Sequence, residues 1–148
     1  MAESPSESDN LREIRTKFVG KWRLVGSENF EDFLKEMGAP YPARKMAGFS
    51  KPDCEVSIID DKVRVYTTTT FWSQEDIIQF NVDYEKEIQK TKMKCHAKYE
   101  DGNILMTMEP IDGSKIKPQK QTRYIDNDNM VLKIEVGDVV AKRIFGRV

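Results

Sequence analysis

Apolar and polar side chains alternate with a period of two residues from Cys54 onward. Val63 and Val65, for example, alternate with Arg64 and Tyr66. This period places the two kinds of side chain on opposite faces of a β-strand. The runs that we interpret as strands cover residues 54–59, 63–70, 76–85, 90–100, 103–108, 115–126, 129–136 and 139–147. Because turn-forming residues separate these short runs, they predict an antiparallel meander, and closure into a barrel would remove its exposed edges.

The segment before this meander predicts one strand followed directly by two short helices. The strand covers residues 18–27, and Asn29 then stands where a helix N-cap is expected. Gly38 suits the left-handed position that ends a helix, and Pro42 suits the first position of the next one. The first helix carries one apolar stripe, formed by Phe30, Phe33, Leu34 and Met37.

The first ten residues are polar and acidic. They lack the basic start and apolar run of a secretory signal, so we expect a cytoplasmic protein. The composition predicts a flexible tail over residues 1–16 and one domain over residues 17–148. Leu11, Ile14 and Phe18 nevertheless have the spacing of one helical face that leads into the domain.

Charge and composition exclude several function classes. The 24 basic and 25 acidic side chains among 148 residues give a net charge of −1, which predicts no bulk attraction to nucleic acid. Cys54 and Cys95 suit free thiols in a reducing compartment. His96 has no nucleophile or metal ligand at a useful spacing, so we expect no enzyme active site, metal site or cofactor.

Two arginines fall on the apolar faces of the last strands. Arg143 shares its face with Ala141 and Phe145, and Arg123 takes a similar place in the strand over residues 115–126. A buried cation needs a partner. From alternation alone, that partner is either a carboxylate that arrives with a ligand or an internal Asp or Glu, and a third interpretation leaves both arginines exposed.

The segment Gly20-Lys21-Trp22-Arg23-Leu24, continued by Asn29-Phe30-Glu31-Asp32-Phe33, resembles the opening signature of the intracellular fatty-acid-binding proteins. Shorter matches occur at residues 43–45, 50–52, 70–71 and 122–123, and the resemblance covers about residues 18–148. It implies a ten-stranded antiparallel up-and-down β-barrel capped by a helix-turn-helix. It also implies reversible binding of a long-chain fatty acid or similar amphiphile in an internal cavity, without catalysis.

The resemblance implies a set of ligand-binding residues as well. These are Arg143, Arg123, Phe145, Phe33, Met37, Phe30, Phe71 and Thr67. One of them departs from the family pattern, because Phe145 stands where carboxylate-binding members usually end an Arg-x-Tyr triplet. Since one hydrogen-bond donor is then missing, we expect weaker affinity or a different head-group preference.

A second set of residues predicts a surface at the helical cap. Lys35, Arg44, Lys45 and Lys51 bring positive charge there, and Trp72 is either an exposed aromatic at the portal or folded onto the barrel. This surface would guide transient contact with anionic membranes, or it is simply a solvated helix face. The family also makes nuclear entry through Lys35, Arg44 and Lys45 possible.

Three other functions compete with a fatty-acid carrier. A carrier of retinoids, sterol-like molecules or other hydrophobes fits the same fold and is favoured by Phe145. A peripheral membrane-organising protein would need a second membrane-binding surface, and the modest net charge argues against it. An enzyme would need a nucleophile and a base, and the sequence offers no such set. A closed barrel has no free strand edge, so we expect a monomer.

Overall fold

The computed structural model describes residues 5–70, 72–88, 90–111, 113 and 116–148. Its helices are α1 (Pro5–Lys17), α2 (Phe30–Glu36) and α3 (Tyr41–Phe49). Its strands are β1 (Gly20–Glu28), β2 (Asp53–Ile59), β3 (Lys62–Thr68), β4 (Ser73–Ile78), β5 (Asp83–Ile88), β6 (Thr91–Glu100), β7 (Asn103–Pro110), β8 (Gln119–Asp126), β9 (Asn129–Val136) and β10 (Val139–Arg147). No helix among the described residues is long and apolar enough to cross a bilayer.

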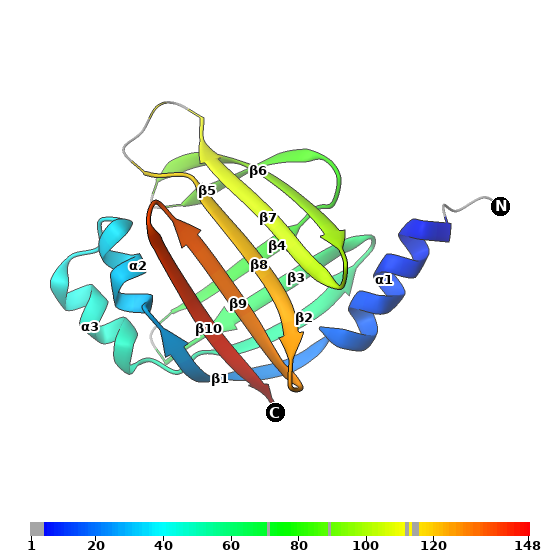
Figure 1. The fold of residues 1–148 in the computed structure, drawn as a ribbon, viewed down its shortest axis with the longest axis horizontal. Coiled ribbons are helices and arrows are strands. Elements are labelled where there is room, and N and C mark those ends of the chain that lie inside the picture. The colour runs from blue at the N-terminus through cyan, green and yellow to red at the C-terminus, as the bar shows by residue number, and fades with distance from the viewer. Residues whose placement is uncertain (1–4, 71, 89, 112, 114–115) are drawn as a thin grey trace.

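All ten strands form one antiparallel sheet in the order β4-β3-β2-β1-β10-β9-β8-β7-β6-β5. The sheet curls back on itself, and α2 and α3 lie together at one end (Figure 1). The predicted ten-stranded barrel with a helical cap is therefore confirmed. Within the described residues, β4 and β5 share no ladder of backbone hydrogen bonds, and we call the line between them the seam.

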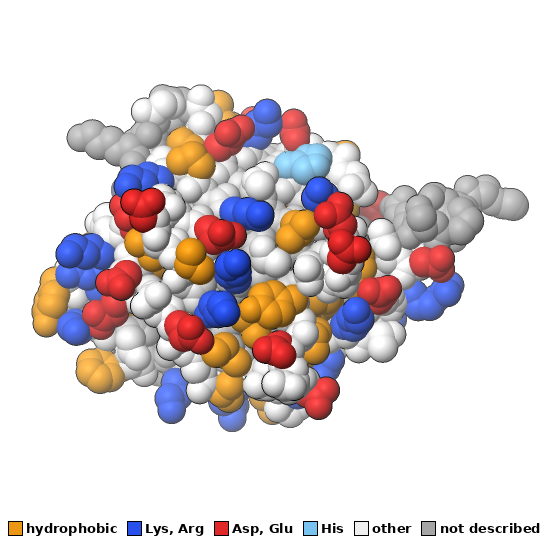
Figure 2. Space-filling model, viewed as in Figure 1, with side chains coloured by type: hydrophobic (Ala, Val, Ile, Leu, Met, Phe, Trp, Pro, Cys, Tyr) orange, Lys and Arg blue, Asp and Glu red, His pale blue; other side chains and the backbone are white. Residues whose placement is uncertain are grey.

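The core follows from the alternation along each strand. On β6, for example, Met93, Cys95 and Ala97 are fully buried, whereas the residues between them are exposed. Figure 2 shows the outer face over β7 to β10, where basic side chains lie among acidic ones. This face thus carries no broad field of one sign, as the balanced composition predicts.

Two predicted strand boundaries are wrong. The run over residues 76–85 is not one strand, because β4 ends at Ile78 and β5 begins at Asp83. Asn81 between them has a left-handed φ of 63°, and its N–H donates to the carbonyl of Ala97. A left-handed residue cannot continue a strand. The strand predicted from residue 115 begins later, at Gln119.

The cap also differs from the sequence prediction in one detail. Asn29 precedes α2 as expected, but its φ is 56° and its side chain caps no helical N–H. Its amide donates instead to the carbonyl of Val140, with an N–O distance of 3.1 Å. Gly38 does end α2 in the left-handed region, with a φ of 89°.

Residues 5–16 of the flexible tail predicted over residues 1–16 lie in helix α1 (Pro5–Lys17), and residues 1–4 lie outside the described residues. Helix α1 lies at the end of the barrel opposite α2 and α3 (Figure 1). Ile14 and Phe18 are fully buried, so their spacing outweighs the polar composition of the segment. The Arg147 guanidinium holds the end of α1, because it donates to the carbonyls of Lys17 (2.8 Å) and Val19 (3.0 Å). Where the domain begins stays a prediction.

Candidate functional site

Arg123 and Arg143 lie in one inward-facing row of the sheet. Each of them is the register partner of Leu132, Arg143 on β10 and Arg123 on β8. Each residue is only 7% exposed. Two strand spacings separate the two backbones, which is about 10 Å. Because side chains in one row point to the same side of the sheet, two guanidinium groups face one region of the interior.

No described acidic side chain forms an ion pair with either arginine. The guanidinium carbon of Arg143 lies 3.7 Å from the centre of the Phe30 ring, a cation–π contact. Burial lowers the pKa of Arg143 to about 10, because desolvation disfavours the charged form. These arginines are therefore neither exposed nor paired with a described internal acid. Two of the three interpretations given above are thus excluded.

The positive charge of Arg123 affects the pKa values of side chains on β2 and β5, on the opposite side of the barrel. Burial raises the pKa of Cys54 on β2, and the positive charge of Arg123 opposes that rise. The same two causes act in the same directions on Tyr84 of β5. Arg123 thus faces the interior space that Cys54 and Tyr84 also border.

Helix α2 covers this region with an apolar face. The rings of Phe30 and Phe33 stack with their centres 5.6 Å apart. Met37 is 7% exposed and packs with Ile134 and Val136 of β9. The apolar stripe predicted from the sequence therefore lies over the inner face of β9 and β10, next to the arginines.

The remaining predicted ligand residues take different positions. Phe145 is buried and pairs with Met130, in the inner row next to that of Arg143. Thr67 is half-buried and pairs with Cys54. Phe71 lies outside the described residues.

A pocket of about 510 Å³ lies between α3 and the turn that joins β3 to β4. Phe49 is 86% exposed and Met46 is 61% exposed at this pocket. Trp72 is 48% exposed, so it takes the exposed one of its two predicted positions. Three large apolar side chains therefore meet solvent at the helical end of the barrel; we call Met46, Phe49 and Trp72 the portal cluster.

The predicted basic surface is only partly free. Lys45 forms an ion pair with Glu31 of α2 at 3.2 Å, and Arg44 donates to the carbonyl of Ala39 at 2.9 Å. Lys35 and Lys51 are exposed. The side chains nearest to solvent at this end thus combine two lysines with the portal cluster.

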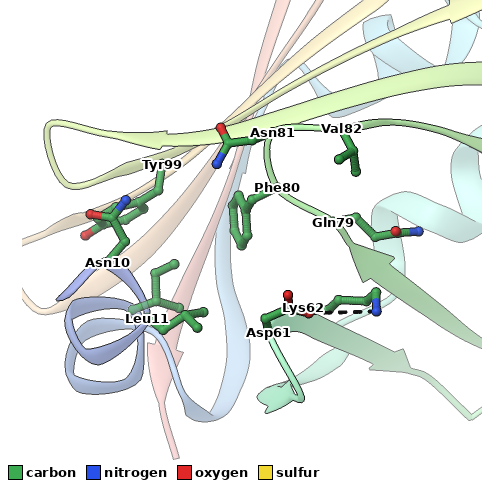
Figure 3. A pocket seen from close by; sticks show the side chains of 10 residues that line it. Asn10, Leu11, Asp61, Lys62, Gln79, Phe80, Asn81, Val82 and Tyr99 are labelled. Carbon is green, nitrogen blue, oxygen red and sulfur yellow. Dashed lines mark ion pairs between the residues drawn. The ribbon is translucent and has the colours of Figure 1, made fainter. Parts of the chain in front are cut away.

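Another pocket, of about 410 Å³, lies at the opposite end of the barrel between α1 and the β4–β5 connection. In Figure 3 the Phe80 ring stands between Leu11 of α1 and the Asp61–Lys62 ion pair. None of the predicted ligand residues lines this pocket. Helix α1 therefore covers the end of the barrel opposite α2 and α3.

Comparisons with known proteins agree with this geometry. The profile of the lipocalin / cytosolic fatty-acid binding protein family matches residues 19–148. This chain belongs to that family. It is 30% identical over 131 residues to an adipocyte fatty acid-binding protein of Pygoscelis papua. The matched region covers 88% of this chain and 97% of the relative.

Two further similarities extend this result. The chain is 34% identical to the sodium/calcium exchanger regulatory protein 1 of Doryteuthis pealeii, over 88% of this chain and 96% of the relative. Its fold is similar to that of lipid binding protein 8 from Caenorhabditis elegans, with a TM-score of 0.84 and 23% identity over 90% of this chain and 96% of the other. The matched family region begins after α1.

Several residues that the fold brings to the interior were not predicted from the sequence. Gln119 and Gln121 face inward on β8, and their two-residue spacing from Arg123 was a signal that could have found them. Asp76 and Lys86 also face inward, but the false continuous strand concealed their proximity. The exposure of Phe49 had no sequence signal, because an apolar residue in a short helix is usually buried.

Proposed function

We propose that this chain binds long-chain fatty acids reversibly inside the barrel and carries them through the cytosol without catalysis. One observation carries the proposal: Arg123 and Arg143 face one interior region with no described acid paired to them. A fatty-acid carboxylate supplies the missing anion. The guanidinium fork matches a carboxylate geometrically and stays charged when it is buried.

The energetics suit a reversible carrier. Charge-assisted hydrogen bonds contribute about 1.5–3 kcal/mol each. Burying about fourteen methylenes contributes at most about 11 kcal/mol, at about 0.8 kcal/mol each. Association and ordering offset much of this sum, so dissociation constants between about nanomolar and micromolar follow.

Displacement of a bound naphthalene-sulfonate dye by oleate tests this proposal. We expect oleate to displace the dye from the wild type, and to do so at least about tenfold less tightly from Arg143→Ala or Arg123→Ala. Lys142→Ala is the matched control, because Lys142 neighbours Arg143 on β10 but faces outward. If retinol displaced the dye and oleate did not, this result would contradict the fatty-acid assignment.

The same proposal includes transient membrane contact at the helical end. Exposed aromatic side chains bind the membrane interface, and nearby lysines attract anionic lipid. Transfer of a fluorescent fatty acid to anionic vesicles should slow in Phe49→Ser. Val25→Ser is the control, since Val25 is 63% exposed on β1 instead. Transfer that does not change with anionic lipid, with salt or with Phe49→Ser would contradict membrane contact. Aggregation of the vesicles would favour a membrane-organising role.

Assembly and nuclear entry complete the proposal. The protein acts as a monomer, which sedimentation with and without oleate tests. Lys35, Arg44 and Lys45 form a surface for nuclear entry when ligand is bound. Fluorescence of tagged protein in oleate-fed cells tests this, with Lys92→Ala as a control on β6. Cytosolic signal that oleate does not change would contradict nuclear entry.

A further inference from the structure

An ion pair lies inside the barrel at the seam. Asp76 of β4 is the register partner of Val65, and Lys86 of β5 is the register partner of Met93. Both partners are core residues, so both charged side chains face inward. Lys86 Nζ pairs with Asp76 Oδ1, which is buried, and the Gln74 amide donates to Asp76 Oδ2 at 3.4 Å. The side chains of Asp76 and Lys86 are 17% and 20% exposed.

Asp76 is unusual among the acidic residues of the described strands. All the others have exposed or polar register partners, whereas Asp76 lies opposite buried Val65. It also borders the region that Arg123 faces. Besides burial, the negative charge of Asp76 raises the pKa of Cys54 and of Tyr84, and the positive charge of Arg123 opposes it at both groups.

These observations place one interior acid within electrostatic reach of the groups that Arg123 also reaches. A buried carboxylate without a partner is unfavourable and seeks a cation. Were Asp76 to pair with Arg123, it would neutralise half of the arginine row.

We propose that Lys86 is a positioning residue for anion binding: it holds Asp76 at the seam and so leaves Arg123 free for the carboxylate of the ligand. The inference rests on the proposed function. Without Lys86, Asp76 competes with the ligand for Arg123 and repels the ligand's charge. The effect therefore falls on carboxylate ligands and spares neutral ligands with the same chain.

A purely structural role would look different. If the ion pair only ties β4 to β5, its loss loosens the barrel for every ligand alike. Removing Asp76 as well would then not restore ligand binding, because the ion pair that joins β4 to β5 would still be missing. Anionic and neutral ligands together with a double variant thus separate the two roles.

The experiment compares Lys86→Met, Asp76→Asn and the double variant Asp76→Asn/Lys86→Met with the wild type at pH 8. Dye displacement gives the affinities for oleate and for oleyl alcohol, which has the same chain and no charge. Lys86→Met should weaken oleate binding by about tenfold or more and change oleyl alcohol binding by less than about twofold. The double variant should return to within about threefold of wild type for oleate.

Matched controls keep the result interpretable. Lys92→Met removes an exposed lysine from β6, and circular dichroism with thermal unfolding checks that each variant folds. Lys86→Gln carries the same expectation should Lys86→Met fail to fold. Unchanged oleate binding in the Lys86 variants would overturn the inference, as would equal losses for both ligands without rescue in the double variant. Failure of the proposed function is distinct, because the wild type itself would then not bind oleate.

Discussion

At the scale of single residues, the candidate site depends on a buried charge that the fold does not neutralise. Arg143 has the Phe30 ring beside it and no described acid paired with it. A cation–π contact replaces only part of the lost hydration. The fold therefore holds a buried cation at some expense to its own stability, which is typical of a site organised for binding.

Replacing this charge should stabilise the protein without ligand. We expect Arg143→Met to raise the free energy of unfolding by about 1–2 kcal/mol, because it removes a desolvated cation and keeps an apolar stem. Since burial lowers the pKa of Arg143 to about 10, the folded state holds this proton less tightly than the unfolded state. The gain should thus persist through neutral pH and shrink above about pH 10.

Urea unfolding across this pH range measures the effect, with Lys142→Met as the outward-facing control. Saturating oleate should cancel or reverse this gain, since it stabilises the wild type by about 1.4 kcal/mol more than a variant that binds it tenfold less tightly. Lower stability of ligand-free Arg143→Met at pH 7 would contradict the argument.

Phe145 offers the complementary test of the head-group site. Phe145→Tyr adds a hydroxyl in the inner row next to that of Arg143. A hydrogen bond contributes about 0.5–1.5 kcal/mol, so oleate affinity should rise by about two- to tenfold. Calorimetric titration measures it, with oleyl alcohol as the uncharged comparison. An equal gain for both ligands would show that the hydroxyl does not act on the carboxylate.

At the scale of elements, α1 shows that a short apolar spacing can outweigh polar composition. Ile14 is fully buried at the end of the barrel that lies away from α2. Ile14→Ala should lower the free energy of unfolding by about 2–5 kcal/mol, through lost burial and a new cavity. Thermal and urea unfolding measure this change. Arg15→Ala, one residue along on the exposed face, should stay within about 0.5 kcal/mol, and an equal effect of both substitutions would mean that α1 is not docked.

The sequence predicted most elements because each carries its own local signal. The apolar stripe of α2, the left-handed Gly38 and the alternation on β10 all appear in the structure as expected. The inward position of Arg123 and Arg143 follows from the same alternation. These features depend on a few neighbouring residues, which a sequence pattern reports directly.

The errors concern features that depend on distant contacts. A continuous strand would place Asp76 and Lys86 about 33 Å apart, whereas the break at Asn81 brings them into contact. Asn29 is a residue type that often caps helices, but its side-chain amide donates to the Val140 carbonyl instead. Neither partner lies near in the sequence, so local propensity could not identify them.

At the scale of the whole molecule, the barrel is closed by unlike junctions. The first and last strands, β1 and β10, pair through a regular ladder with one bulge near Gly26. The seam between β4 and β5 has the Asp76–Lys86 ion pair and, beside it, an isolated bridge between Phe80 and Ala97. The seam therefore lacks the ladder of backbone hydrogen bonds that joins the other neighbouring strands among the described residues.

This difference predicts where the barrel opens first. Amides on the seam-facing edges of β4 and β5 should exchange with solvent faster than amides between β8 and β9, because no ladder bond must break. Hydrogen exchange followed by NMR measures the protection of each amide. Equal protection on both sides of the barrel would mean that side-chain packing alone closes the seam as firmly as a ladder does.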